Sequence, residues 1–169
     1  MVSTLTEKKI DKEILRTQVL GRLEVNYKLQ LQGAKRAHAA ATHEENTPDN
    51  KYATLGLEAS YLAQGQANRA QEILQAQQQF RQLNLANFSA DSTIRLTAVV
   101  ELVDDRKNRR RVFLVPAAGG LILDVDGVEI MLITPASPLG QELIGRACGD
   151  AVTLASGTTG REYEIVSIC

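Results

Sequence analysis

Apolar residues recur every three or four positions through the first part of the chain. Between residues 8 and 42 no proline interrupts this spacing, so the pattern predicts one long amphipathic helix. The stripe consists of Ile10, Ile14, Leu20, Leu23, Tyr27, Leu31, Ala34, His38 and Ala41. A helix of about 35 residues is roughly 50 Å long, which exceeds what a small domain covers, so we expect a partner helix to pack along it.

A second apolar stripe begins after a short polar segment. Its members are spaced alternately four and three residues apart, which is the heptad spacing of a coiled coil. It consists of Leu55, Ala59, Leu62, Gln66, Arg69, Ile73, Ala76, Phe80 and Leu83. Pro48, Asp49 and Asn50 favour a turn between the two stripes. We therefore expect residues 1–85 to form an antiparallel coiled-coil hairpin rather than part of a compact bundle, because no further long amphipathic segment would complete one.

The second half of the chain changes to short apolar runs separated by turn residues. Strands are expected over residues 93–103, 110–115, 121–125, 128–133, 151–155 and 162–168. Asp126-Gly127 is a strong signal for a two-residue hairpin. Ser137 is a candidate N-cap with Pro138 at the first position of a short helix that Gly145 ends. The sequence thus predicts an α+β chain, with a largely antiparallel sheet domain and one short helix over residues 92–169.

Charge and composition narrow the classes of function. Lys and Arg number 19 against 20 Asp and Glu, and the net charge is −1, so we do not expect a broad electrostatic surface for nucleic acid. No apolar run approaches the roughly 18 residues that span a bilayer, and residues 1–11 lack the apolar core of a signal peptide. We therefore expect a cytoplasmic protein without membrane contact. Cys148 and Cys169 match neither a zinc spacing nor a disulfide framework.

No catalytic arrangement stands out in the sequence. There are only two histidines, and neither a nucleophile elbow nor a phosphate-binding loop is present. We therefore expect neither an enzyme nor a cofactor of the protein's own. The densest basic cluster is Arg109, Arg110 and Arg111, preceded by Arg106 and Lys107. It is a candidate contact for RNA or for an acidic surface, and a solvated hairpin turn is the alternative.

Three carboxylates fall close together where the helical hairpin is expected to turn. They are Glu44, Glu45 and Asp49. At the far end of a long rod such side chains are candidate ligands for Mg²⁺, a hard cation that takes carboxylates and water. The alternative is that they are acidic residues in an exposed turn without a specific role.

Residues 132–150, which read LITPASPLGQELIGRACGD, resemble a segment of the bacterial Gre transcript-cleavage factors. The matching positions are Ser137, Pro138, Leu139, Leu143, Ile144, Gly145, Arg146, Gly149, Asp150 and Val152. Residues 160–166 are similar to the family's final strand. A Gre factor is a coiled-coil hairpin followed by an FKBP-like domain, so the resemblance covers nearly the whole chain and implies an FKBP-like fold over residues 92–169.

The resemblance also implies a partner, bacterial RNA polymerase. The C-terminal domain would anchor the protein to it, and the hairpin would enter the polymerase's secondary channel. The expected partner-binding residues are Ser137, Pro138, Leu139, Arg109, Arg110 and Arg111. In the role of the family's tip acids, Glu44, Glu45 and Asp49 would share Mg²⁺ with the polymerase active site and assist cleavage of backtracked RNA. Contact with nascent RNA and a monomeric state are further expectations.

Three other functions stay open at this point. Residues 58–61 resemble the end of the family's tip motif, and an ungapped match then puts Thr54 and Leu57 where the family has acids. This favours a channel-binding regulator without cleavage activity. The FKBP-like fold also allows a peptidyl-prolyl isomerase, although Phe113 and Tyr163 are the only aromatic residues after Asp91. The third is a scaffold that dimerises through its coiled coil.

Overall fold

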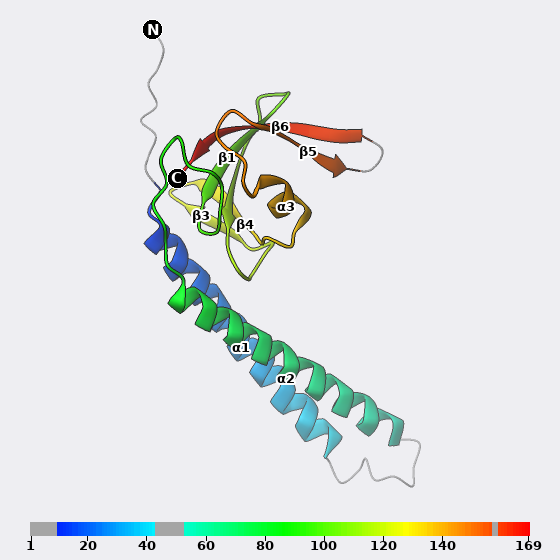
Figure 1. Ribbon diagram of the computed structural model, residues 1–169. Helices are drawn as coiled ribbons and strands as arrows, with labels where there is room; N and C mark the ends of the chain where they lie inside the picture. The colour runs from blue at the N-terminus through cyan, green and yellow to red at the C-terminus, as the bar shows by residue number, and fades with distance from the viewer. Residues whose placement is uncertain (1–9, 43–52, 157–158) are drawn as a thin grey trace. The chain divides into compact units, whose positions relative to one another are not determined.

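The computed structural model describes residues 10–42, 53–156 and 159–169. Two long helices precede a six-stranded sheet and a short helix (Figure 1), so the predicted fold class is confirmed. The helices are α1 (Lys12–Ala41), α2 (Ala53–Gln82) and α3 (Pro138–Leu143). The strands are β1 (Val99–Asp104), β2 (Arg109–Leu114), β3 (Ile122–Val125), β4 (Val128–Ile133), β5 (Ala151–Ser156) and β6 (Thr159–Ile168). No helix in these ranges is long and apolar enough to cross a membrane.

The chain divides into two compact units. One is Val19–Arg81, which contains most of both long helices, and the other joins the chain up to Gln18 with Gln82–Cys169. The first turns of α1 therefore belong to the same unit as the sheet. The predicted domains, 1–85 and 92–169, stay a prediction.

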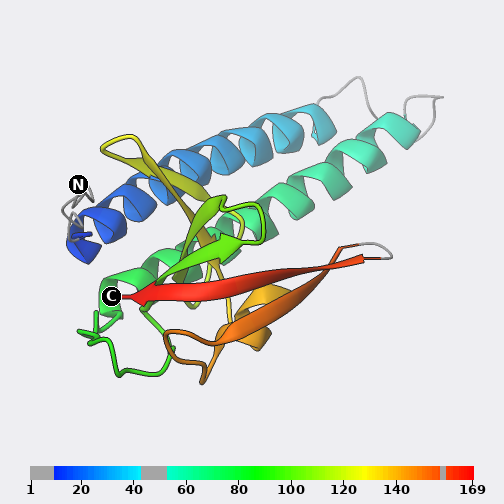
Figure 2. The same cartoon turned by 90° about the horizontal axis from the view of Figure 1, so that it is seen from above.

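In the first unit, α1 and α2 lie side by side and run in opposite directions (Figures 1 and 2). The buried side chains between them differ in part from the predicted stripes. On α1 they are Val19, Leu23, Ala34 and Ala37, and on α2 they are Ala70, Ile73, Gln77 and Phe80. His38 and Arg69 are exposed, and so is Leu62, at 56%. At His38 and Arg69 the predicted register was therefore wrong by one residue, because the buried positions are Ala37 and Ala70.

The charge of Arg69 explains this shift of register on α2. Arg69 on α2 points outward and pairs with Glu72 at 2.8 Å, because an unpaired guanidinium in the seam would lose its hydration. The next residue, Ala70, takes the buried position. Near the base of α1 the same correction applies: Leu15 is buried, whereas Ile14 is 46% exposed.

Two glutamines interrupt the apolar seam. Gln77 donates from Nε2 to Glu24 Oε2 at 3.0 Å, and this bond is the main cause that lowers the pKa of Glu24. Gln66 lies over Gly33, where an added Cβ would come within 2.6 Å of its Nε2. Among the described side chains, Gln66 Oε1 is a buried polar atom without a hydrogen-bond partner. Gln77 must lie opposite Glu24 to keep its hydrogen bond, and Gln66 must lie opposite Gly33 to have room. These two pairs therefore fix the register of the hairpin.

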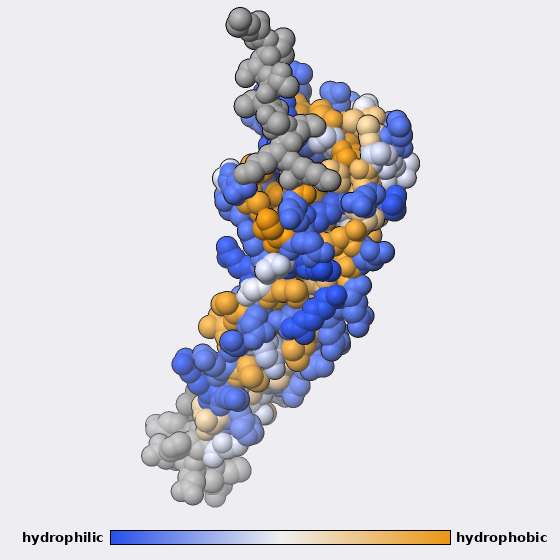
Figure 3. Space-filling view, turned by 90° about the vertical axis from the view of Figure 1, so that its left-hand side faces the viewer, coloured by the Kyte–Doolittle hydropathy of each residue, from blue (hydrophilic) through white to orange (hydrophobic). Residues whose placement is uncertain are grey.

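Most of the hairpin surface is polar, with single apolar side chains between. Figure 3 shows hydrophobic patches scattered among hydrophilic ones on the face that it presents. Val25 and Leu29 on α1 are 65% and 63% exposed, and Tyr61 on α2 is 71% exposed. Isolated apolar residues of this kind are normal on a protein surface.

The sheet has the order β3-β4-β2-β1-β6-β5. Four of its pairings are antiparallel, as predicted, but β2 and β4 are parallel. The prediction of a largely antiparallel sheet is therefore confirmed, and β2 with β4 is the exception among the described strands. The predicted turn at Asp126-Gly127, with φ of 56° and 78°, folds β3 back along β4. Since β3 is antiparallel to β4 and β4 is parallel to β2, the strands β2 and β3 run in opposite directions.

One face of the sheet carries the main core, which Leu139 and Leu143 of α3 cover. The other buried members of this cluster are Ile94, Ala98, Val100, Leu102, Val112, Leu114, Ile133, Val152, Tyr163, Ile165 and Ile168. The second face is also buried in part, because Phe113, Ile130 and Leu132 are fully inaccessible. The sheet is therefore an interior layer along β2 and β4, which holds the connection to α3 in a fixed place.

The corrected register can be tested with adjacent substitutions on α2. Ala70→Glu places a carboxylate at a position that is 5% exposed, so it should lower the free energy of unfolding by about 2 kcal/mol or more. Arg69→Glu, at an exposed position, should cost less than about 1 kcal/mol. Urea unfolding followed by helical circular dichroism measures both. Equal losses for the two variants would contradict the register.

Candidate partner-binding groove

The loop before α3 is held by a helix cap that the sequence predicts. Ser137 adopts an extended backbone conformation, and its Oγ accepts a hydrogen bond from Gly140 N at 3.1 Å. The same hydroxyl donates to Thr134 O at 2.7 Å. Pro138 occupies the first turn, where its missing N–H costs nothing. The predicted N-cap is therefore confirmed, and both hydrogen bonds of the Ser137 hydroxyl tie α3 to the end of β4.

Gly140 permits a close approach that no other residue would allow. A Cβ at this position would lie 2.0 Å from Thr134 O, which is a backbone atom and cannot swing away. At the other end of the helix, Gly145 has a φ of 81° and donates from its N–H to Ile94 O at 2.8 Å. The segment from Thr134 to Gly145 is thus fixed at both ends.

A groove of about 490 Å³ lies beside this loop. Its lining consists of Arg110, Gly119, Gly120, Met131, Leu132, Ile133, Thr134, Ser137, Pro138, Leu139 and Leu154. The structure therefore brings Arg110 together with Ser137, Pro138 and Leu139, which are four of the six predicted partner-binding residues. Met131 and Leu154 also line the groove, although their strand pattern in the sequence gives no sign of it.

Arg110 is the only charged side chain that lines this groove in the described part of the chain. It is partly buried, and its Nη2 lies 3.8 Å from Met131 Sδ. Within the described residues no carboxylate pairs with its guanidinium. A half-buried cation next to apolar side chains has lost hydration without gaining a counter-ion. The groove is thus suited to a ligand that carries a carboxylate beside an apolar group.

The other two arginines of the cluster face away from the groove. Because side chains alternate along a strand, Arg109 and Arg111 lie on the opposite face of β2 from Arg110. There Glu101 Oε1 pairs with Arg109 at 2.9 Å and with Arg111 at 3.5 Å. The Glu101 side chain is 7% exposed, so its two arginine partners compensate a buried charge.

A tight turn positions the basic strand. Asp104 Oδ1 accepts hydrogen bonds from the backbone N–H groups of Arg106 at 2.9 Å and Asn108 at 2.8 Å. Its Oδ2 accepts from Asn108 Nδ2 at 2.9 Å, and this side-chain bond is the main cause that lowers the pKa of Asp104. These bonds set the register at which β2 leaves the turn, and hence which arginine faces the groove.

The second predicted site, the carboxylates of the hairpin tip, lies outside the described residues. This holds for Glu44, Glu45 and Asp49. Thr54 and Leu57, which an ungapped match to the family places at the acidic positions, are exposed on the first turns of α2. Within the described ranges, no group of three or more His, Cys, Asp or Glu side chains is arranged to hold a metal ion.

The chain is thus a helical hairpin followed by a six-stranded sheet domain with one short helix. Residues 89–169 match the family model described as "Transcription elongation factor, GreA/GreB, C-term". Residues 89–169 are therefore a domain of the GreA/GreB C-terminal type.

Two curated relatives and two solved structures are similar to the chain. The transcription elongation factor GreA of Xanthomonas axonopodis pv. citri is 33% identical over 86 residues, and that of Xanthomonas campestris pv. campestris is 31% identical over 86 residues. The matched part spans 51% of this chain and 51% of each relative, about half of their length. The crystal structure of Thermus aquaticus Gfh1 is 26% identical, with a TM-score of 0.40 over 90% of this chain and 92% of the other. Thermus thermophilus Gfh1 is 24% identical, with a TM-score of 0.39 over 91% and 94%.

The cap that holds the groove can be tested at Ser137. Ser137→Ala removes the oxygen that accepts from Gly140 N and should lower the free energy of unfolding by about 1 kcal/mol. Ser137→Thr keeps the hydroxyl and should cost about half as much or less. Urea unfolding curves of the two variants give the comparison. Equal destabilisation by both would show that the hydroxyl does not hold the loop.

Proposed function

We propose that the chain is a Gre-type transcription elongation factor that binds bacterial RNA polymerase. The C-terminal domain anchors it, and the helical hairpin enters the secondary channel. The observation that carries this proposal is the match of residues 89–169 to the GreA/GreB C-terminal domain, since these residues include the whole groove. The protein acts in the cytoplasm as a monomer.

The groove supplies the anchoring contact. Its apolar floor, which includes Met131, Leu139 and Leu154, takes an apolar side chain of the polymerase. Arg110 pairs with a neighbouring carboxylate and so regains the electrostatic interaction that its burial costs. Ser137 and Pro138 keep the wall of the groove rigid, so little conformational entropy is lost on binding. In this proposal the exposed Arg109, on the other face of β2, contacts nascent RNA.

The hairpin supplies the reach into the channel. Each of its helices has 30 residues and is therefore about 45 Å long. The seam is narrow because alanines pack at Ala34, Ala37 and Ala70. A slender rod with a polar surface is suited to a water-filled channel.

Cleavage of backtracked RNA would depend on the polymerase's own chemistry. The protein is not itself an enzyme and needs no cofactor of its own. Glu44, Glu45 and Asp49 would contribute ligands to Mg²⁺ shared with the polymerase active site, and the charge of this ion favours ionised water at neutral pH.

A specific observation favours a second candidate, a channel-binding regulator without cleavage. Leu57 is a 55% exposed apolar residue at a position where the ungapped match to the family expects an acid.

The anchoring role can be tested with a matched pair on β2. Arg110→Gln removes the charge that faces the groove and should weaken binding to core RNA polymerase at least about tenfold. Arg109→Gln removes a charge from the opposite face and should change the affinity by less than about threefold. Competition binding against a labelled wild-type chain measures both variants. An affinity unchanged by Arg110→Gln would contradict docking through the groove.

The two versions of the function differ in one measurement. If the tip acids work with Mg²⁺, replacing Glu44, Glu45 and Asp49 together by alanine should abolish RNA cleavage in a stalled complex and leave polymerase binding nearly intact. If the chain is a regulator without cleavage, the wild type itself stimulates none but still competes with cleavage-active Gre factors for the channel. Strong cleavage by the triple variant would contradict the role of these acids.

A further inference from the structure

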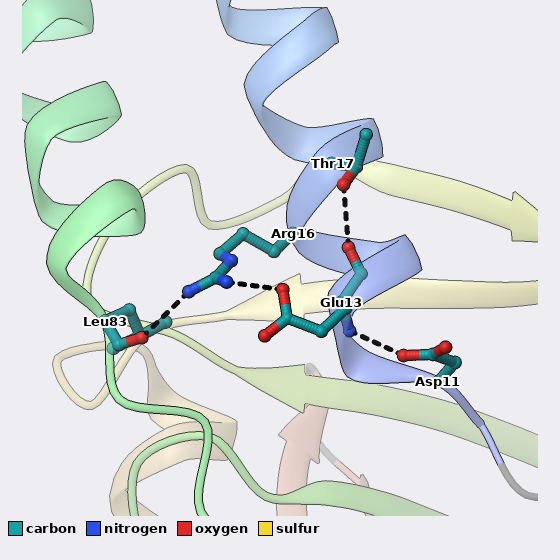
Figure 4. Close-up of polar contacts among 5 residues, drawn as sticks. All are labelled: Asp11, Glu13, Arg16, Thr17 and Leu83. Atoms are coloured by element: carbon teal, nitrogen blue, oxygen red, sulfur yellow. Dashed lines mark hydrogen bonds and ion pairs between the residues drawn. The ribbon is translucent and has the colours of Figure 1, made fainter.

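The first turns of α1 hold the segment that leads from α2 to the sheet. Arg16 donates from Nη1 to Leu83 O at 3.2 Å and forms an ion pair with Glu13 (Figure 4). The helix start is fixed by Asp11, whose Oδ1 accepts from Glu13 N at 2.9 Å. Thr17 Oγ1 donates to Glu13 O at 2.9 Å. Glu13 and Arg16 are therefore satisfied by each other and by the backbone around them.

Lys12 makes the second contact with this segment. Its Nζ donates to Ala86 O at 2.7 Å and lies 4.4 Å from the centre of the Phe88 ring. Arg95 contacts the same ring, with Cζ 4.6 Å from the centre. One phenyl ring thus has two cations as neighbours. Ala86 is held from the other side as well, because its N–H donates to Thr97 Oγ1 at 3.0 Å.

A groove of about 670 Å³ opens beside this lysine. Its lining consists of Ile10, Asp11, Lys12, Glu13, Leu85, Asn87, Phe88 and Cys169. It is separate from the groove at α3, with which it shares no lining residue. A small molecule in it therefore reaches the Lys12 side chain without passing through the protein interior.

The surroundings of Lys12 favour its neutral form. Burial is the main cause that lowers the pKa of Lys12 from 10.5 to about 8, and the positive charge of Arg95 acts in the same direction. A negative charge at Cys169 opposes them. Of the other charged groups in the groove, Glu13 is paired with Arg16, and Asp11 is bonded to the Glu13 N–H. Near neutral pH a much larger share of Lys12 is therefore a free amine than is usual for a lysine.

We propose that Lys12 is an acylation site that takes a small acyl group from an activated donor, such as an acyl phosphate or a thioester. The lone pair of neutral Nζ attacks the carbonyl carbon of the donor. The bond from that carbon to phosphate oxygen or to sulfur breaks, and the leaving group departs with the bonding electrons. Nζ gives one proton to water and becomes an amide nitrogen. No oxidant or metal is needed.

Acylation changes what Lys12 does in the structure. The amide is neutral, so the Phe88 ring loses one of its two cations. One N–H remains to donate to Ala86 O, but without the charge that strengthens the present bond. Arg16 still holds Leu83, so the segment loosens at residues 86–88 and stays attached at residue 83. This site goes beyond the polymerase-binding role and does not depend on it.

The reactivity can be measured by trace labelling of the full chain with acetyl phosphate, followed by peptide mass spectrometry. At pH 7.5 Lys12 should be acetylated at least about tenfold faster than Lys28 and Lys35, which are exposed on the same helix. The rate at Lys12 should level off above about pH 8, where its amine is already neutral. Hydroxylamine treatment removes acetyl groups from Cys169 and so separates thiol from amine labelling. A rate at Lys12 equal to that at Lys28 would overturn the proposal.

Two variants sharpen the test. Arg95→Gln removes a positive neighbour, so it should raise the pH at which labelling of Lys12 levels off, and an unchanged profile would overturn the electrostatic argument.

Lys12→Arg keeps a cation but cannot be acetylated under these conditions. After acetyl phosphate treatment, chymotrypsin should cut faster after Phe88 in the wild type and at an unchanged rate in Lys12→Arg. Equal rates in both would overturn the loosening of residues 86–88.

Discussion

The parallel pairing of β2 with β4 is the constraint on which the C-terminal domain depends. It places Arg111 opposite Ile130 and Val112 opposite Met131, so Arg110 comes next to the residues that begin the groove. It also points the end of β4 toward α3, where Thr134 meets Gly140 too closely for any side chain between them. If β4 paired with β2 in the other direction, the loop from Thr134 would start at the opposite end of the sheet. The helix cap at Ser137, the position of α3 and the groove therefore depend on the strand order β3-β4-β2.

A different constraint governs the hairpin, because α1 and α2 pack closely and uncharged side chains lie between them. Ala34, Ala37 and Ala70 are buried with only a methyl group as side chain, and Gly33 leaves room for the Gln66 amide. Leu23, Ile73 and Phe80 are larger apolar side chains that are also buried. Small side chains bury little apolar area, so this part contributes less to stability than the part with leucine and phenylalanine. The hydrogen bond of Gln77 to Glu24 adds register rather than much free energy, because it replaces hydration of the same groups. The Gln66 Oε1 atom is buried without a partner among the described residues, so Gln66 contributes to register at a cost in free energy.

The sequence predicted most of the elements because their signals are local. The cap at Ser137-Pro138, the turn at Asp126-Gly127 and the two long helices each depend on neighbouring residues alone. The errors arose where a longer-range choice decides. Ala70 and Arg69 both fit a heptad spacing to within one residue, and only the facing helix determines which of them is buried. Likewise, strand periodicity cannot state that β4 enters between β3 and β2.

For the candidate site, too, the sequence revealed local patterns but not the contacts between distant segments. The pattern around Ser137 was visible in the sequence because a helix cap has its own residue types. The basic run at Arg109–Arg111 was visible as charge, but its separation into two faces required the strand. Met131 and Leu154 gave no separate signal, since apolar residues in strands are ordinary core residues until a loop is placed beside them. The roles of these residues in binding stay predictions, as do those of Glu44, Glu45 and Asp49.

Cations with three kinds of surroundings occur in the unit that contains the sheet. Arg109 and Arg111 have a carboxylate, Glu101, and their charges are satisfied within the fold. Lys12 has a carbonyl and a ring but also a lowered pKa, so its charge is removed easily and its amine is available for chemistry. In the described part of the chain, Arg110 has only the Met131 thioether as a polar neighbour. Its charge has no carboxylate beside it among the described residues, and for this reason we propose Arg110 as the cation that a binding partner stabilises most.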